Sequence, residues 1–317
     1  MSILVVGSVA FDGIESPSGK RDRVLGGAAT HFALAASFFT KVRMIAVVGE
    51  DFGAAEETVL TSHGIDTQGI EHVPGKSFFW RGAYLNDLNQ ADTLATELNV
   101  FESFAPKIPA AYADSEYLFL ANIDPVLQER VRAQLPDVRM VCGDTMNYWI
   151  GGARENLLRV LAGLDTLLIN YGEARLLAGE SNLLRAARAI LELGPKSLIV
   201  KHGEYGATAF FSERSFPGEY GSQSVAFRAP TLPLDEVVDP TGAGDSFAGG
   251  FFGSLAETNA KTGLVTPSPS DWKRAMFYGA ALGSFACERF GTERVQSLTR
   301  DEIDARVAEL RAISHLD

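Results

Sequence analysis

Short apolar runs alternate with helix-like segments along most of this 317-residue chain, and this alternation restricts its fold more than any other feature. It predicts a mostly parallel sheet with helices on both faces, which is a three-layer α/β fold. The predicted buried strands lie at residues 3–6, 44–48, 117–120, 139–142, 166–169 and 197–200. The predicted helices lie at residues 28–39, from the turn at 49–53 to about 63, and at 125–134, 152–161 and 182–193.

The remaining segments depart from the alternation. A hairpin is predicted at 207–211 and 224–227, followed by helices at 242–257, 271–288 and 300–313. Residues 12–25 are too polar to belong to a core, and the aromatic-rich segment 75–85 resembles an exposed strand. We therefore predict one α/β domain over residues 1–317, with a small sheet from about 12–25 and 75–90 that forms a lid.

The charge and the cysteines limit the partners and the compartment. Asp and Glu number 40 against 28 Lys and Arg, and this formal charge of -12 makes nucleic acid an unfavourable partner. Cys142 and Cys287 lie in apolar segments and are predicted to be free, buried thiols, which fits a reducing compartment. Neither a secretory signal nor an apolar run of membrane-spanning length is evident. We expect a cytoplasmic protein that has no membrane partner.

The stretch Asp239-Pro-Thr-Gly-Ala-Gly-Asp245 carries the strongest chemical signal. Gly242, Ala243 and Gly244 open a predicted helix, whose bare N–H groups and positive dipole end suit an anion. These features fit the charge that develops on a phosphoryl group during transfer. Asp245, in the first helical turn, is kept ionised by the dipole and can accept a proton from an attacking hydroxyl. The alternative is that Asp245 is only an acid that stabilises the start of a helix.

Two other nucleotide-binding motifs are absent from this sequence. Gly75-Lys76-Ser77 is not a P-loop, because Ile70 stands where the earlier glycine is required and Pro74 intervenes. Gly242-Ala-Gly244 leads to Phe247 rather than to a third glycine, so it is not a dinucleotide fingerprint. A nucleotide-dependent dehydrogenase is therefore disfavoured.

The motif at 239–245 resembles the C-terminal signature of the ribokinase (PfkB-type) carbohydrate and nucleoside kinases. The resemblance extends over nearly the whole chain, through Gly7-Ser8 with Asp12, Gly26-Gly27 before a small-residue helix, and Val48-Gly-Glu-Asp-Phe-Gly53. It continues through Asn170-Tyr-Gly-Glu173 and Lys201-His-Gly203-Glu-Tyr-Gly206. It implies a ribokinase-like sandwich and an ATP-dependent phosphotransferase that acts on an alcohol.

The resemblance also implies roles for individual residues. Asp245 would be the general base, and residues 242–244 the anion hole. Asn170 and Glu173 would organise phosphates and Mg²⁺, Glu173 through water, as suits an ion that keeps much of its hydration shell. The cofactor-binding residues would be Asn170, Glu173, Lys201, Gly203, Gly206 and Gly244. Asp239 and Thr241 match positions where some members hold a monovalent cation, so K⁺ is a further candidate.

Several of these residues have structural alternatives. Glu173 could simply be a helix-start acid, and Gly203 and Gly206 could belong to an ordinary hairpin turn. Asp144 and Asn147 follow a predicted strand and could either reach the cleft or form a turn.

The substrate side is assigned to Asp12, Gly26, Gly27 and His31. A carboxylate can accept hydrogen bonds from two neighbouring hydroxyls, which suits a polyol, although Asp12 could also be a solvated loop acid. Gly27 permits close backbone approach. Many members of the family carry asparagine where this chain has His31, so either an altered substrate or a histidine satisfied by a neighbour is expected there.

The aromatic residues of the lid allow two interpretations. Phe79, Trp80 and Tyr84 could close over a substrate and exclude water, or they could pack two lids together in a homodimer. Because strand residues alternate, Phe78 and Trp80 need not face the same way as Phe79.

The sequence thus predicts a kinase that transfers the γ-phosphoryl group of ATP to a sugar or sugar-like polyol. A nucleoside kinase of the same family is the first alternative. A non-catalytic regulator that binds sugar or nucleotide is the alternative from another class, and it would be expected to lack the base or the anion hole.

Overall fold

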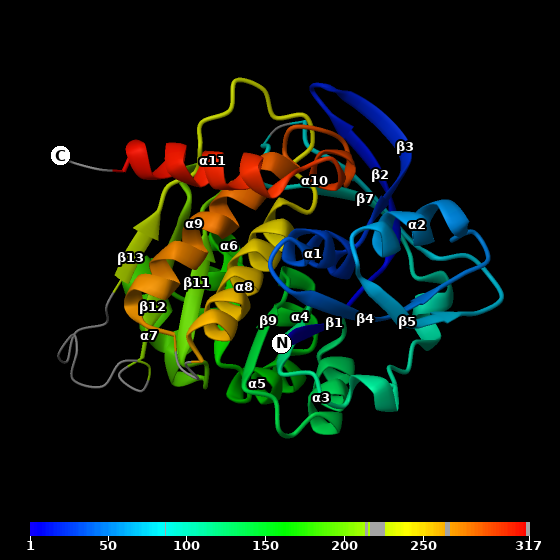
Figure 1. The fold of residues 1–317 in the computed structure, drawn as a ribbon, viewed down its shortest axis with the longest axis horizontal. Coiled ribbons are helices and arrows are strands. Elements are labelled where there is room, and N and C mark those ends of the chain that lie inside the picture. Colours follow the sequence, from blue (N-terminus) through cyan, green and yellow to red (C-terminus); the bar gives the residue numbers. More distant parts are fainter. Residues whose placement is uncertain (86, 213–214, 216–225, 264–266, 315–317) are drawn as a thin grey trace.

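The computed structural model describes residues 1–85, 87–212, 215, 226–263 and 267–314. Within these residues, nine strands form one large sheet in the order β13-β12-β11-β10-β9-β8-β1-β4-β5 (Figure 1). The strands from β11 to β5 in this order pair in parallel, whereas β12 pairs antiparallel with both β11 and β13. Their bounds are Ser2–Val6 (β1), Lys41–Val48 (β4), Asp66–His72 (β5), Tyr117–Leu120 (β8), Met140–Asp144 (β9), Thr166–Asn170 (β10), Ser197–Lys201 (β11), Ala207–Phe211 (β12) and Ala226–Ala229 (β13).

Helices cover both faces of this sheet, because its central strands are apolar on both sides. On one face lie α1 (Ala28–Ser37), α2 (Ala54–Ser62), α8 (Ala243–Thr262), α9 (Pro269–Ala286), α10 (Glu293–Gln296) and α11 (Arg300–Ala312). The other face is covered by α3 (Pro125–Gln134), α4 (Asn147–Gly152), α5 (Arg154–Ala162), α6 (Tyr171–Ala178) and α7 (Leu183–Glu192). The predicted three-layer arrangement is confirmed.

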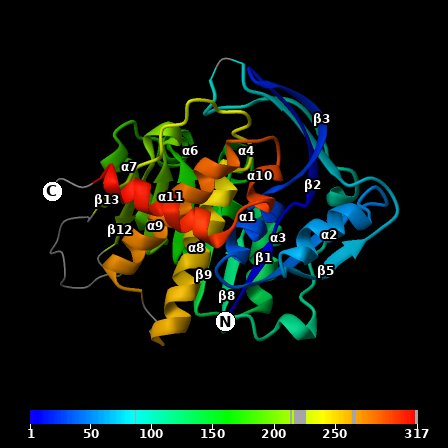
Figure 2. The ribbon, with the colours of Figure 1, turned by 45° about the horizontal axis from the view of Figure 1, so that its top comes forward.

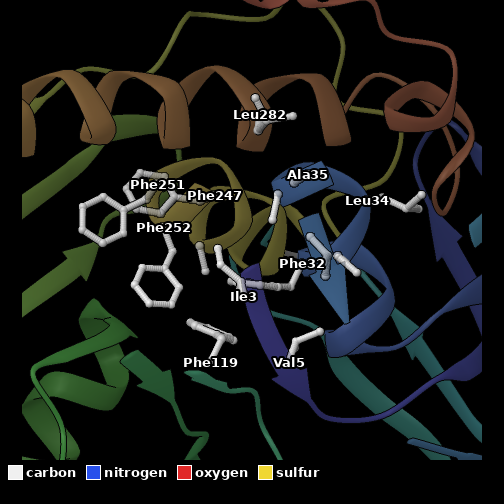
Figure 3. Close-up of a cluster of buried hydrophobic side chains, with 14 of the residues drawn as sticks. Ile3, Val5, Phe32, Leu34, Ala35, Phe119, Phe247, Phe251, Phe252 and Leu282 are labelled. Carbon is white, nitrogen blue, oxygen red and sulfur yellow. The ribbon is translucent and has the colours of Figure 1, made fainter. Parts of the chain in front are cut away.

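Aromatic packing fixes α1 and α8 against the sheet. Phe32 of α1 stacks on Phe119 of β8 with ring centroids 4.0 Å apart, and Phe252 of α8 contacts the same ring (Figure 3). Burying each such side chain contributes about 1.5–3 kcal/mol. Phe32 and Phe252 therefore hold α1 and α8 over the middle of the sheet.

Glycines let α8 approach its neighbours closely. A Cβ atom at Gly249 would lie 2.3 Å from the carbonyl oxygen of Phe32 in α1. A Cβ atom at Gly250 would lie 2.8 Å from the carbonyl oxygen of Tyr278 in α9. The glycines that follow the 239–245 motif thus serve helix packing.

A second sheet of four described strands lies beside the carboxyl end of β1, in the order β3-β2-β6-β7. Its strands β2 and β3 arch away from the large sheet (Figure 2). The strands are Ala10–Ser16 (β2), Gly19–Gly26 (β3), Phe78–Ala83 (β6) and Asp92–Glu97 (β7). The predicted small sheet from residues 12–25 and 75–90 is therefore present, with β7 as an unpredicted addition.

One expectation about this small sheet is wrong. Residues 12–16 are not excluded from the interior, because Asp12, Gly13, Ile14 and Ser16 are buried. The pairing of β2 with both β3 and β6 covers this polar segment.

Smaller differences concern single elements. The helix predicted at 152–161 corresponds to α5 (Arg154–Ala162), whereas the short α4 (Asn147–Gly152) before it was not predicted. Helix α6 begins inside the Asn170–Glu173 motif. The predicted hairpin is formed by β12 and β13, although residues 224 and 225 of the prediction lie outside the described residues. Cys142 and Cys287 are free, with Cys142 buried and Cys287 partly buried. In the part of the chain that the structure describes, no helix is long and apolar enough to cross a membrane.

Candidate active site

Three polar residues end neighbouring parallel strands at one edge of the large sheet. Asp144 ends β9, Asn170 ends β10 and Lys201 ends β11. The register pairs Asn170 with Lys201 and places Asp144 beside Leu168 of β10. The carboxyl edge of a parallel sheet is where such folds bind ligands, so these side chains mark a candidate site.

The amino terminus of α8 lies at the same edge. Gly242 is its N-cap and has a left-handed conformation with φ 73° and ψ 1°. The Ala243 N–H donates to the Pro240 carbonyl, whereas the amides of Gly244 and Asp245 lie in the first turn, where a helix offers no acceptor. This arrangement has the geometry predicted for an anion-binding site.

Asp245 and Lys201 face each other across this helix start. A Cβ atom at Gly244 would lie 2.7 Å from the Lys201 Nζ atom, so the ammonium group lies against the first turn of α8. Burial raises the pKa of Asp245, and the Lys201 charge opposes that rise. The structure therefore brings the predicted base, the predicted anion hole and Lys201 together.

Asp144 belongs to the same cluster, although the sequence alone allows it either to reach the cleft or to form a turn. Its side chain is buried and hydrogen-bonded to Asp245. Burial and the Asp245 charge raise the pKa of Asp144 well above its usual range, whereas its hydrogen bond lowers the pKa of Asp245. A protonated Asp144 thus favours the ionised form of Asp245. Asn147 is exposed and begins α4, so only Asp144 of this pair lies in the cluster.

Asn170 and Glu173 form a capping box at the start of α6. The Asn170 side chain accepts from the Glu173 N–H at 2.8 Å, and the Glu173 carboxylate accepts from the Asn170 N–H at 2.8 Å. Burial raises the pKa of Glu173, with Lys201 opposing and Asp245 adding to the rise. Glu173 is therefore a helix-start acid and also lies within electrostatic reach of Asp245.

The loop between β11 and β12 contains the predicted nucleotide-binding glycines. The His202 N–H donates to the Gly206 carbonyl at 2.7 Å, which closes a hairpin turn. A Cβ atom at Gly203 would lie 1.6 Å from the Asn89 Oδ1 atom, and one at Gly206 would lie 2.1 Å from the Ala229 carbonyl oxygen. Packing against backbone therefore requires a glycine at position 206, whereas at position 203 the close atom belongs to the exposed Asn89 side chain. The role of both glycines in nucleotide binding stays a prediction.

Asp239 and Thr241 shape the loop that leads into α8. Asp239 is completely buried, and its two carboxylate oxygens accept from the Thr241 N–H at 2.8 Å and the Gly291 N–H at 2.7 Å. The Thr241 hydroxyl donates to the Tyr84 Oη atom at 3.1 Å. Both residues thus have structural partners, and a monovalent cation beside them stays a prediction.

Asp12 belongs to β2 of the small sheet, and its side chain lies beside Gly26 and Gly27, which precede α1. Its side chain is 5% exposed, and a Cβ atom at Gly26 would lie 1.9 Å from its Oδ2 atom. Burial, together with the charges of Asp239 and Asp245, raises the pKa of Asp12 to about 7, against a hydrogen bond from the Gly27 backbone. The predicted substrate acid is therefore buried and close enough to Asp245 to sense its charge.

His31 joins the substrate side to the anion hole. Its Nδ1 atom would be 2.3 Å from a Cβ atom at Gly242, so the ring lies directly on that glycine. The ring is 2% exposed, and neither of its nitrogens has a hydrogen-bond partner among the described residues. Burial lowers the pKa of His31 to about 4, so the ring is neutral near pH 7. The expected alternative of a neighbour that satisfies this histidine is not observed.

The two aromatic residues at the centre of β6 face opposite sides of the small sheet. Trp80 pairs with Asp12 in the register, and its ring lies across Gly82. Phe79 instead lies beside Gly13, with Arg81. Trp80 therefore shares the face of Asp12, and Phe79 does not.

The comparisons with known proteins agree with this arrangement. The model of the pfkB family carbohydrate kinases matches residues 3–298, and the chain belongs to this family. It is a phosphotransferase with an alcohol acceptor, of the carbohydrate and nucleoside kinase class.

Two curated relatives and one solved structure illustrate the similarity. A cytidine kinase of Thermococcus kodakarensis is 30% identical over 258 residues, which cover 79% of this chain and 87% of the relative. A nucleoside kinase of Methanothermobacter thermautotrophicus is 26% identical over 326 residues, which cover 92% of this chain and 91% of the relative. The ribokinase II structure from E. coli in complex with ATP and Mg²⁺ has a TM-score of 0.75 at 21% identity and covers 97% of this chain and 99% of that one. The ribokinase-like fold is confirmed.

Proposed function

We propose that this chain transfers the γ-phosphoryl group of ATP to a hydroxyl of a nucleoside, with Asp245 as the general base. One observation carries the chemistry: Asp245 stands in the first turn of α8, beside the Gly242–Gly244 helix start and Lys201. The sequence alone ranked a sugar or polyol acceptor first. Relatives named cytidine kinase and nucleoside kinase cover most of the chain and favour a nucleoside instead.

The residues divide the chemistry between them. The Asp245 carboxylate accepts the hydroxyl proton late in a loose transition state, while the α8 amides and Lys201 stabilise the charge on the phosphoryl oxygens. Asp144 holds a proton beside Asp245 and so keeps the base ionised. Asp12 binds hydroxyls of the acceptor, and the neutral His31 offers one donor and one acceptor to it.

Magnesium fits this site when ATP supplies most of its ligands. The charges of Asp245 and Glu173 raise the pKa of Asp144, and the Asp245 charge raises the pKa of Glu173, which indicates surplus negative charge near Lys201. No group of three or more His, Cys, Asp or Glu side chains among the described residues could hold a metal ion. Glu173 and Asn170 would therefore hold hydrated Mg²⁺ through water, and the ion would neutralise phosphate charge.

Three further parts of the proposal concern the whole chain. Residues 1–317 act as one kinase domain in which the small sheet, from about 12–25 and 75–90, is the lid. The segment that contains Asp239 and Thr241 accepts K⁺. The exposed side of the lid, which includes Leu94 at 56% exposure, pairs two copies in a cytoplasmic homodimer.

A panel of acceptors in a coupled ADP-release assay tests the proposed function. Cytidine, inosine and adenosine are expected to exceed free ribose and fructose by roughly tenfold or more in kcat/KM, because a base adds contacts that persist in the transition state. Parallel series in KCl and NaCl test the cation. Preferential turnover of a free sugar would favour a sugar kinase instead. Tight nucleoside binding without ADP release would favour a non-catalytic binding regulator. The expected large loss of activity in Asp245→Asn, prepared in the same way, controls for a contaminating kinase.

The pH profile tests the role of Asp12. Because its pKa is raised to about 7, the carboxylate that binds hydroxyls is present above that pH and is lost below it. We expect kcat/KM to fall as the pH decreases below about 7, by roughly tenfold per unit. Asp12→Asn should lower kcat/KM and remove this limb. If the limb persists unchanged in the variant, the titrating group is another one.

A further inference from the structure

A tyrosine of the lid is hydrogen-bonded to the loop that positions α8. Tyr84 directly follows β6, and its N–H donates to the Glu15 carbonyl at 2.8 Å, so it continues the pairing with β2. Its Oη atom accepts from the Thr241 hydroxyl at 3.1 Å, across 157 positions of sequence. Burial and nearby carboxylates raise the pKa of Tyr84, so the phenol remains protonated.

The Tyr84 ring is fixed by a small apolar cluster. The ring is 8% exposed and packs with Ile14 of β2 and Phe290, which follows α9. Trp80 and Val238 border the same cluster. The position of the hydroxyl is therefore tied to the small sheet on one side and to the segment before Asp239 on the other.

The backbone of Thr241 is held by hydrogen bonds in the interior of the domain. Its N–H donates to the Asp239 carboxylate, which is held in turn by the Gly291 N–H. The main chain of Thr241 is thus fixed from the interior and its side chain from the lid. The next residue is Gly242, the N-cap of α8, so any displacement of Thr241 moves the start of the anion hole.

The lid also touches the loop assigned to the nucleotide. The Asn89 side chain, between β6 and β7, lies against Gly203, and its N–H and Nδ2 groups donate to the Asp87 Oδ1 atom at 2.8 and 3.2 Å. The lid segment that follows β6 thus contacts the loop before α8 through Tyr84, and the loop between β11 and β12 through Asn89.

We propose that Tyr84 is a positioning residue for phosphoryl transfer, whose hydroxyl holds Thr241 and thereby aligns the α8 amides when the lid is closed. This inference rests on the proposed kinase function. It makes full alignment of the anion hole depend on the lid, which covers the acceptor and excludes water. Loss of the hydrogen bond between Tyr84 and Thr241 should therefore lower kcat, because alignment of the α8 amides matters most in the transition state. It should leave KM nearly unchanged.

Tyr84→Phe removes only the hydroxyl. We expect kcat to fall roughly tenfold, because the partly buried Thr241 hydroxyl loses its acceptor, with KM changed by less than about threefold. Tyr117→Phe is the matched control, since the Tyr117 Oη atom also accepts a buried side-chain bond, from Asn259 Nδ2 at 3.0 Å. Tyr117 begins β8, at the end of the sheet opposite the site, so its variant should keep the wild-type kcat.

Variants of Thr241 separate positioning from general destabilisation. Thr241→Val should lower kcat as Tyr84→Phe does, and the double variant should be no slower than the slower single variant, because both remove the same bond. Thr241→Ser keeps the donor and should retain most of the activity. Wild-type kcat in Tyr84→Phe, an increase in KM alone, or additive losses in the double variant would overturn the proposal.

Amide hydrogen exchange tests the proposal without any assumption about which acceptor the enzyme uses. Tyr84→Phe should accelerate amide exchange in β6 and in residues 239–245, while Tyr117→Phe should leave both segments unchanged. If the wild-type protein phosphorylates no nucleoside, the proposed function fails, yet the exchange rates still decide whether the lid holds the catalytic loop. Unchanged exchange in both segments of Tyr84→Phe would overturn the proposal.

Discussion

Asp245→Asn is expected to lower turnover by a factor on the order of 10²–10⁴ while nucleotide and nucleoside binding remain nearly intact. Asparagine has a similar shape but cannot accept the proton of the attacking hydroxyl. The substitution of one carboxylate oxygen by an amide group has little effect on the hydrogen bond with Asp144 or on the contact between Lys201 and the helix start. Single-turnover kinetics and calorimetric binding of both ligands measure the two effects separately.

A second helix-start acid provides the control for this variant. Asp271 lies in the first turn of α9, where its carboxylate accepts from the Ser268 N–H at 2.9 Å. Asp271→Asn should cost about 0.3–1 kcal/mol of stability through the lost charge at the helix start and leave kcat unchanged. If Asp245→Asn behaved in the same way, Asp245 would be only a helix-start acid and the assignment of the base would be wrong.

Gly242→Ala is expected to lower kcat by about 10²–10³, the cost of disturbing a preorganised group of oxyanion-type donors. The added Cβ atom would lie 2.3 Å from the His31 ring, in a backbone with φ 73° that L-residues rarely adopt. The ring and the helix start cannot both keep their positions. Steady-state kinetics with saturating ATP measure the loss.

The opposite end of the same helix offers a matched control. Gly263, the C-cap of α8, has φ 70° and ψ 2°, but a Cβ atom there would meet no atom of the described residues within 4 Å. Gly263→Ala carries the same conformational strain, of order 1–3 kcal/mol, without the collision. Equal losses of kcat in the two variants would show that strain rather than geometry at the anion hole is responsible.

The large sheet could be predicted because its central strands are buried on both faces. Such strands are continuous apolar runs, as in the segments that became β1, β8, β10 and β11. Strand β5 is an edge strand with the polar sequence Asp-Thr-Gln-Gly-Ile-Glu-His, and β7 is largely exposed. Neither has an apolar run, and their pairing depends on partners distant in sequence.

The site could be predicted only where its residues are adjacent in the chain. The helix start at 242–245 is local, so its glycines and its acid indicate the chemistry together. Asp144 was not assigned, because the predicted strand ended at Cys142 and its closeness to Asp245 depends on strand order and helix placement. The contact of His31 with Gly242 likewise requires α1 and α8 to be packed side by side.

The glycines at 249 and 250 have a consequence for how such an enzyme changes its acceptor. They bring the backbone of α8 against those of α1 and α9, so the helix that carries Asp245 has no room to slide or rotate. Under the proposed function, variation in acceptor size must therefore be absorbed elsewhere, by the small sheet and by the residue at position 31. The reaction centre stays constant while substrate choice is free to diverge.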